Sequence, residues 1–176
     1  IGSRVVAWEE KTLANLPALG ERIGFQVFDR NFYESQGIIE DAEFIPLLRN
    51  QTRLLWPQER EVLVRHGLRE GLKVADICCG CGDVALLIAR DLKPAMVMGV
   101  DHSLPAIEYA TRLQREFKVR NADFRLGDAT ALMLEDEQFD FVLCRLSIQI
   151  FSRPELILKE LYRILKPGGR LYLNGE

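Results

Sequence analysis

The sequence predicts an α/β fold, in which a doubly wound, mostly parallel β-sheet carries helices on both faces. From residue 71 onward, short apolar runs alternate with longer segments of helical periodicity. Most of the strand candidates are apolar along their length, which is typical of strands buried on both faces. The 176 residues, of which 48% are hydrophobic, suffice for one globular domain with its own core.

Two parts of different character divide the chain. Residues 1–70 show no alternation of strands and helices, and we expect them to form a helical cap on the substrate side of the molecule. Residues 71–176 carry the alternating pattern and form the predicted core, so the chain is one domain overall. Because the pattern stops after a fifth strand, the sheet is expected to be incomplete at its C-terminal side.

Helical spacing in the cap begins with the aromatic residues Phe25, Phe28 and Phe32. They form either a stripe that faces the core or a lid over a ligand opening, where aromatic faces contact a cation.

A second helical pattern covers residues 38–55, where Pro46 indicates a break or a new start. Trp56-Pro57 then opens another predicted helix, which runs to about His66.

Five strands and three helices are predicted in the core. The strands are short runs bounded by glycine, proline or charged residues, at residues 73–77, 95–100, 123–126, 139–144 and 170–173. One helix covers residues 83–91, and another starts at Ser103, whose hydroxyl is expected to cap it. The third starts at a Ser152-x-x-Glu155 capping box and ends at a turn of residues 166–169. Strands connected in this way form a parallel sheet with right-handed crossovers.

The stretch from Val74 to Arg90 reads as a buried strand, a tight turn and a helix. Gly80 and Gly82 lie in the turn, where glycine permits unusual backbone angles and a close approach to a ligand. The helix start also presents unpaired N–H groups. This arrangement is typical of a site for a nucleotide or a nucleotide-like cofactor. Ligands of parallel sheets bind beyond the carboxyl ends of the strands, so the residues that follow each strand are the candidates.

Two classes of cofactor fit this turn. The spacing Gly80-x-Gly82-x-x-Ala85, with Asp101 after the next strand, meets the loose dinucleotide fingerprint of NAD(P)-dependent oxidoreductases. Asp76 argues against a dinucleotide and favours a different nucleotide-like cofactor, because a dinucleotide-binding strand is normally apolar up to its first glycine.

The core resembles the class I S-adenosylmethionine-dependent methyltransferases, which have a Rossmann-like fold. Its first motif is Val-Ala-Asp76-Ile-Cys-Cys-Gly-Cys-Gly82, an acid followed by a glycine-rich turn. Three later segments match the family in order and spacing: Gly99-Val-Asp101, Gly127-Asp128-Ala129, and Phe139-Asp-Phe-Val-Leu-Cys144 followed by Leu165-Lys-Pro-Gly-Gly-Arg-Leu171.

This resemblance implies a site for S-adenosylmethionine at the strand ends. Asp76 and the turn would surround the methionine part, Asp101 would accept the ribose hydroxyls, and Asp128 would accept the adenine amino group. Leu104 and Leu146 would form apolar walls of the site. For Asp101 and Asp128 there is an alternative, in which each aspartate only caps the helix that follows it. The implied cofactor-binding residues are Asp76, Cys78, Cys79, Gly80, Gly82, Asp101, His102, Leu104, Asp128, Ala129, Cys144 and Leu146.

The cysteines depart from the pattern of the family. Cys78 stands where glycine is usual, and its side chain restricts the backbone angles of the turn. With the strand order of the family, Cys144 would end near this turn, which leaves a redox pair or a thiolate metal site as alternatives. Three cysteines in one tight loop do not suit tetrahedral coordination, so we expect small buried thiols and no metal.

These inferences predict an enzyme that transfers a methyl group from S-adenosylmethionine to an unidentified, small-molecule acceptor and leaves S-adenosylhomocysteine. No residue identifies a catalytic base, and the cap and residues 145–149 are expected to form the acceptor pocket. The alternatives are an NAD(P)-dependent oxidoreductase and a non-catalytic domain of the same fold.

Charge and hydropathy limit the partners. The net charge of −3 and the lack of any run of Lys and Arg make nucleic acid an unexpected partner. No apolar run is long enough to span a bilayer, and the N-terminus lacks the features of a signal peptide. The sequence therefore indicates a cytoplasmic protein, of undetermined oligomeric state.

Overall fold

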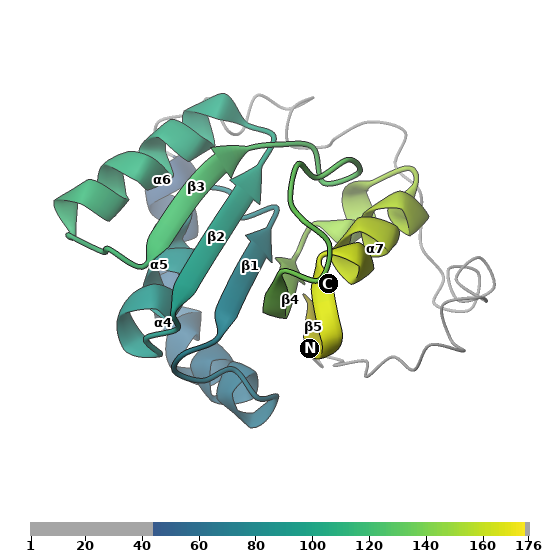
Figure 1. The fold of residues 1–176 in the computed structure, drawn as a ribbon. Helices are drawn as coiled ribbons and strands as arrows, with labels where there is room; N and C mark the ends of the chain where they lie inside the picture. Colours follow the sequence, from purple (N-terminus) through teal and green to yellow (C-terminus); the bar gives the residue numbers. More distant parts are fainter. Residues whose placement is uncertain (1–43, 175–176) are drawn as a thin grey trace.

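A parallel β-sheet forms the centre of the protein (Figure 1). The computed structural model describes residues 44–174. All strand pairs are parallel, in the order β3-β2-β1-β4-β5. The α/β fold class is confirmed, and each predicted strand is present. The first has the predicted bounds and the other four differ at one or both ends: β1 Lys73–Ile77, β2 Met96–Asp101, β3 Ala122–Leu126, β4 Phe139–Arg145 and β5 Leu165–Asn174.

The strand order reverses beside β1. The chain first builds outward through β2 and β3, and then returns to place β4 on the other side of β1. At the carboxyl end of β1, Ile77 is paired with Val100 of β2 and with Cys144 of β4. Ligands of doubly wound sheets bind at such a reversal, so this end of β1 is the expected place of the site.

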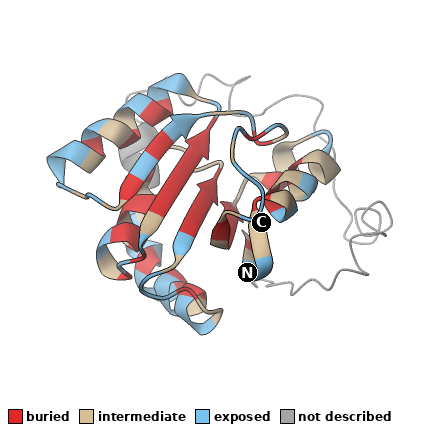
Figure 2. Ribbon diagram, in the orientation of Figure 1, coloured by how far each residue is buried: buried red, intermediate tan, exposed pale blue. Residues whose placement is uncertain are grey.

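Helices cover both faces of the sheet. Helices α4 Phe44–Arg65, α5 Asp83–Asp91 and α6 Leu104–Glu116 lie on one face, and α7 Pro154–Arg163 lies on the other with the segment 127–138. Successive residues of β1 enter opposite cores: Val74 packs with the first group of helices, and Ala75 packs with α7. Figure 2 shows burial along β2 and most of β1, and alternating burial on the edge strand β3.

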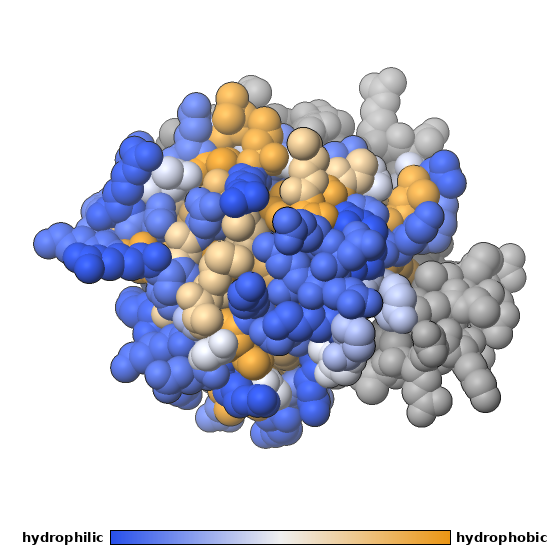
Figure 3. Space-filling view, in the orientation of Figure 1, coloured by the Kyte–Doolittle hydropathy of each residue, from blue (hydrophilic) through white to orange (hydrophobic). Residues whose placement is uncertain are grey.

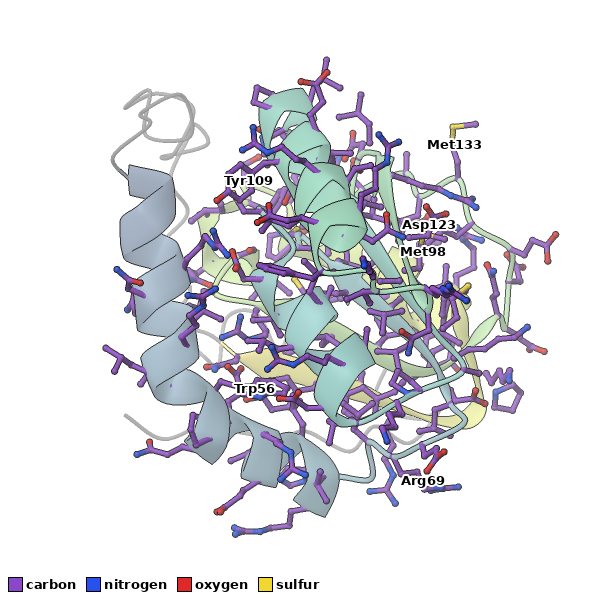
Figure 4. All side chains as sticks on the ribbon, turned by 90° about the vertical axis from the view of Figure 1, so that its left-hand side faces the viewer. Trp56, Arg69, Met98, Tyr109, Asp123 and Met133 are labelled. Atoms are coloured by element: carbon purple, nitrogen blue, oxygen red, sulfur yellow. The ribbon has the colours of Figure 1, made fainter. Side chains whose placement is uncertain are left out.

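Helix α4 is continuous, which corrects the prediction of two helices that meet at Trp56-Pro57. A proline inside a helix removes one backbone hydrogen bond and crowds the preceding turn. Here the packing supports the helix, because Trp56 and Leu63 are buried in the core. The indole Nε1 of Trp56 also donates a 2.7 Å hydrogen bond to Asp91 of α5, and Figure 4 shows Trp56 on the inner side of α4. Tertiary contacts therefore outweigh the local break.

Helix α7 begins one residue later than the predicted capping box requires. Pro154 is in the first helical turn and Arg153 is the N-cap, with no hydrogen bond from a capping side chain. A residue before proline avoids helical angles, which fixes this start. Glu155 instead pairs with Arg153, with Oε1 2.9 Å from Nε. The Ser152-x-x-Glu155 capping box is therefore a wrong prediction, whereas the helix itself is present.

Strand β5 includes residues 166–169, which were predicted to be a separate turn. Leu165 already pairs with Phe139, and the register shifts before Arg170 pairs with Phe141. Residues 166–169 of β5 therefore form an irregularity in the pairing, because β5 has more residues than β4 between these two pairs.

The predicted cap is described only in part. The segment with Phe25, Phe28 and Phe32 lies outside the described residues, as do residues 38–43. Pro46 lies near the first described residue of α4, so the predicted break or new start at that proline stays a prediction.

Candidate functional site

A pocket of about 230 Å³ opens at the carboxyl ends of the strands. The residues that line it end β2 or follow β1, β2 and β3, together with one aromatic residue that follows β4: Cys78, Val100, Asp101, His102, Gly127, Asp128, Ala129 and Phe151. The fold therefore brings together five residues of the predicted set, namely Cys78, Asp101, His102, Asp128 and Ala129.

The glycine-rich turn between β1 and α5 lies beside this pocket. Gly82 is the N-cap of α5 with φ of 73°, and a Cβ there would lie 2.6 Å from the Phe124 ring and 2.7 Å from Ala110. Gly80 has φ of 53°, and a Cβ there would meet no atom of the described residues within 4 Å. Gly82 is thus required by packing, whereas Gly80 leaves an open approach to the backbone.

Asp101 ends β2 and joins the turn to the start of α6. Its Oδ2 accepts the N–H of Gly80 at 2.8 Å, and its Oδ1 accepts the N–H of Ser103 at 3.0 Å. The Nδ1 atom of His102 is 3.4 Å from Oδ1. Burial raises the pKa of Asp101, but the hydrogen bonds from His102, Ser103 and Gly80 outweigh it and hold the pKa below its ordinary value. The carboxyl group is therefore ionised at neutral pH.

Asp128 follows β3 and also lines the pocket. Its Oδ1 accepts the backbone N–H of Thr130 at 2.8 Å and the hydroxyl of Thr130 at 2.7 Å. These hydrogen bonds lower the pKa of Asp128, so it is also ionised at neutral pH. Within residues 44–174 no hydrogen bond engages Oδ2, which leaves this oxygen for a ligand.

Asp76 lies in a buried group of charges below the turn and is 3% exposed. Nearby, Arg145 at the end of β4 donates two hydrogen bonds to Glu59 of α4, from Nε to Oε1 and from Nη2 to Oε2 at 2.7 Å. Burial raises the pKa of Asp76 to about 7, with Arg145 opposing the shift and Glu59 and Asp101 adding to it. Such perturbed acids cluster at functional sites.

Of the four cysteines, Cys144 is buried, whereas Cys78, Cys79 and Cys81 are half-buried. A hydrogen bond between the Cys78 and Cys144 thiols, together with burial, raises the pKa of Cys78 well above its ordinary value. Burial likewise raises the pKa of Cys79, and that of Cys81 to about 11. The expected approach of Cys144 to the turn is thus present, with all four thiols free. Within the described part of the chain no group of three or more His, Cys, Asp or Glu residues is placed to hold a metal ion.

The two leucines predicted as apolar walls do not line the pocket. Leu104 is 52% exposed at the start of α6. Leu146 follows β4 with φ of 52°, and its N–H donates to the carbonyl of Asn174 at 2.6 Å. Contact of either residue with a cofactor stays a prediction.

Two contributors were missed by the sequence analysis, Glu59 and Phe151. Glu59 has helical spacing with the buried residues Trp56 and Leu63, and this was the available signal that it faces inward. Phe151 follows the short 3₁₀ turn Ile148–Ile150, and local sequence gives no sign that it returns to the pocket.

Helix α4 is also fastened beside the turn. Arg49 Nε lies 3.0 Å from Asp83 Oδ1 in the first turn of α5, and Arg49 Nη1 donates to the Tyr109 hydroxyl at 2.9 Å. The guanidinium of Arg112 stacks on the same ring, 4.7 Å from its centre. Figure 4 shows Tyr109 on the side of α6 that faces α4.

Comparison with known proteins agrees with this geometry. The sequence pattern of the methyltransferase domain matches residues 74–169, which include the turn and both pocket aspartates. This chain belongs to the methyltransferase domain family. The family is that of the class I S-adenosylmethionine-dependent enzymes, in agreement with the resemblance seen in the sequence.

Individual relatives of this methyltransferase domain support the assignment. The demethylmenaquinone methyltransferase of Lactococcus lactis subsp. lactis (strain IL1403) is 34% identical over 118 residues, which cover 66% of this chain and 46% of that protein. A SAM-dependent methyltransferase from Aquifex aeolicus has a TM-score of 0.64 and 26% identity, covering 72% of this chain and 68% of its own. The chain spans about half the length of the curated relatives it matches.

A third relative is a complex with the cofactor. The structure of Haemonchus contortus phosphoethanolamine N-methyltransferase 2 with S-adenosyl-L-methionine has a TM-score of 0.63 and 29% identity, over 67% of this chain and 27% of that chain.

The residues of this methyltransferase domain fit S-adenosylmethionine in chemistry and place. Asp101 and Asp128 bring ionised carboxylates to one pocket, where hydroxyl and amino groups are suitable donors. Gly80 leaves the backbone open to close approach, and Asp76 adds a buried acid near the turn.

Proposed function

We propose that this chain binds S-adenosylmethionine and transfers its methyl group to a small-molecule acceptor. The observation that carries the proposal is the pair of ionised carboxylates, Asp101 and Asp128, that face one pocket beside the open backbone of Gly80. The family assignment and the names of the curated relatives support it.

Each of these residues has a definite part in the proposal. Asp101 would hold the ribose hydroxyls, Asp128 Oδ2 would accept the adenine amino group, and Asp76 would lie toward the methionine amino group. When bound, S-adenosylmethionine supplies a methyl group on a positively charged sulfur and S-adenosylhomocysteine is left. The protein holds the acceptor in line with this group and excludes water, which is the main contribution to such a displacement.

The acceptor is proposed to be a small apolar molecule. Relatives named demethylmenaquinone methyltransferase suggest a quinol-like ring. Exposed apolar side chains near this end of the sheet, Leu104, Leu126 and Met133, agree with such a ligand, and Figure 3 shows hydrophobic groups within a largely hydrophilic face. We assign no catalytic base, because Asp101 and Asp128 already accept hydrogen bonds and are proposed to hold the cofactor.

Calorimetry with S-adenosylhomocysteine tests the cofactor part of this proposal. Asp128→Asn keeps an oxygen for Thr130 and presents an NH₂ group where Oδ2 now lies. Two facing donors should weaken binding by roughly 5- to 100-fold. S-Inosylhomocysteine carries an oxygen in place of the adenine amino group, so the variant should lose little or no affinity for it.

Binding of NAD tests the alternative of an NAD(P)-dependent oxidoreductase. Tight binding of NAD without binding of S-adenosylhomocysteine would contradict the proposal. If S-adenosylhomocysteine binds, transfer of a labelled methyl group to a demethylmenaquinone analogue tests the acceptor class.

The cellular place of the reaction is also a proposal, namely the cytoplasm. No helix among residues 44–174 is long and apolar enough to cross a membrane.

A further inference from the structure

Three charged side chains from three elements meet below the turn. Glu59 of α4 is 9% exposed, and its carboxylate takes two hydrogen bonds from Arg145 at the end of β4. This fork-to-fork geometry fixes the guanidinium and neutralises most of its charge. Helix α4 therefore supplies a counter-charge to β4 inside the core, although it precedes the β–α alternation in the sequence.

Asp76 of β1 lies beside this pair and, unlike Glu59, has no hydrogen-bond donor of its own among the described residues. Within residues 44–174 no side chain or N–H group makes a direct hydrogen bond to Asp76. The groups that act on it are the Arg145 guanidinium, the Glu59 carboxylate, the Asp101 carboxylate of β2 and the neighbouring Cys79 thiol. With all acids ionised, one cation faces three carboxylates, so a second cation is electrostatically favoured there.

We propose that Glu59, by holding Arg145, reserves Asp76 for a cationic group of the ligand, and that Asp76 releases a proton to solvent when that group binds. This inference rests on the proposed function, in which the cation is the amino group of S-adenosylmethionine or S-adenosylhomocysteine. No covalent bond changes except O–H: the carboxyl becomes a carboxylate, and the ligand cation takes the place of the proton.

The burial of the group makes the exchange favourable. An isolated carboxylate is costly in a low-dielectric interior, so burial favours the protonated form of Asp76 in the ligand-free protein. Glu59 is a positioning residue here, because it acts on Asp76 through Arg145 and through its own charge.

Calorimetry in buffers of different ionisation enthalpy counts the protons released on binding. With S-adenosylhomocysteine and the wild type, we expect about half a proton at pH 7, more at pH 6, and little at pH 8. Glu59→Gln frees Arg145 to neutralise Asp76, so the release at pH 7 should fall to near zero. Glu61→Gln removes the same charge from an exposed position of α4 and should leave the release unchanged.

A second variant, Asp76→Asn, tests the inference even if Glu59→Gln does not fold. Asp76→Asn removes the proton donor without breaking the Glu59–Arg145 pair, and release should vanish. Wild-type binding without proton release would overturn the inference and leave the proposed function intact. Release that persists in Asp76→Asn would also overturn it. Absence of S-adenosylhomocysteine binding by the folded wild type would instead count against the proposed function itself.

Discussion

The backbone of Cys78 lies in the left-handed region, with φ of 61°. A residue with a Cβ loses about 1 kcal/mol or more there, and glycine does not. We therefore expect Cys78→Gly to be more stable than Cys78→Ala by about 1 kcal/mol. Both variants lose the hydrogen bond to Cys144, so their difference isolates the backbone term. Urea unfolding of the two variants measures it.

Cys144 provides the matched control, because it lies within strand β4. In an extended strand the order reverses, and Cys144→Ala should be more stable than Cys144→Gly by roughly 0.5–1 kcal/mol. Equal stabilities of the Gly and Ala variants at position 78 would contradict the strain argument.

A single arginine orders the segment 127–138, which connects β3 to β4 without a helix. Arg163 of α7 donates to the carbonyls of Leu132 at 2.9 Å and Leu134 at 2.8 Å. It also binds Glu160 and Asp136, and Glu160 in turn accepts the N–H of Leu132 at 2.8 Å. All five guanidinium donors are thereby used.

Arg163→Met should lower the free energy of unfolding by about 2–4 kcal/mol, because it leaves carbonyls and Glu160 without their donors. Arg153→Met is the control: its pair with Glu155 is exposed, so the change should stay within about 0.5 kcal/mol. A loss of similar size in both variants would show that the network adds nothing to an ordinary surface pair. Chemical denaturation measures both.

Local sequence predicted the elements wherever local and tertiary preferences agree. The buried strands stand out because apolar runs end at glycine, proline or charge, and Ser103 caps α6 as predicted, with Oγ 3.4 Å from the N–H of Ala106. The prediction failed at Pro57, where core packing of Trp56 overrides a helix-breaking signal. It also placed the start of α7 one residue too early, because Pro154 decides it.

Local sequence likewise predicted some residues of the candidate site and not others. Asp101 and Asp128 could be found because every strand of a parallel sheet ends at the same edge. Glu59 could not be found as a site residue, because it reaches the site through a contact with Arg145, which is distant in sequence. Phe151 could not be found either, because the chain returns to the pocket after β4.

For the whole molecule, burial of Asp76 predicts an unusual dependence of stability on pH. Its folded-state pKa of about 7 lies above the ordinary value of 3.8. A group raised in this way stabilises the fold fully below its unfolded pKa, and the contribution is lost as the pH rises through the folded pKa. Between about pH 4 and 7 this group should lower the free energy of unfolding by up to about 1.4 kcal/mol per pH unit.

Asp76→Asn should remove that slope, because the amide does not titrate. Asp101 and Asp140 act in the opposite sense: their lowered pKa values stabilise the fold at neutral pH, and this is lost only below about pH 4. Unfolding curves of wild type and variant between pH 5 and 7.5 separate these effects. Parallel curves would show that Asp76 titrates normally in the folded protein.

The pairing of β1 with β4 also bears on how the site comes into being. Asp76 lies opposite Leu143, although the whole of β2, α6 and β3 separates them along the chain. Closing so long a loop is slow and entropically costly, so we expect this pairing to form in the late steps of folding. During synthesis, the glycine turn emerges well before Arg145 and Phe151, so the Glu59–Arg145 pair and the Phe151 side of the pocket are absent until they arrive. A cofactor that needs both sides would therefore select completed chains and leave unfinished ones unbound.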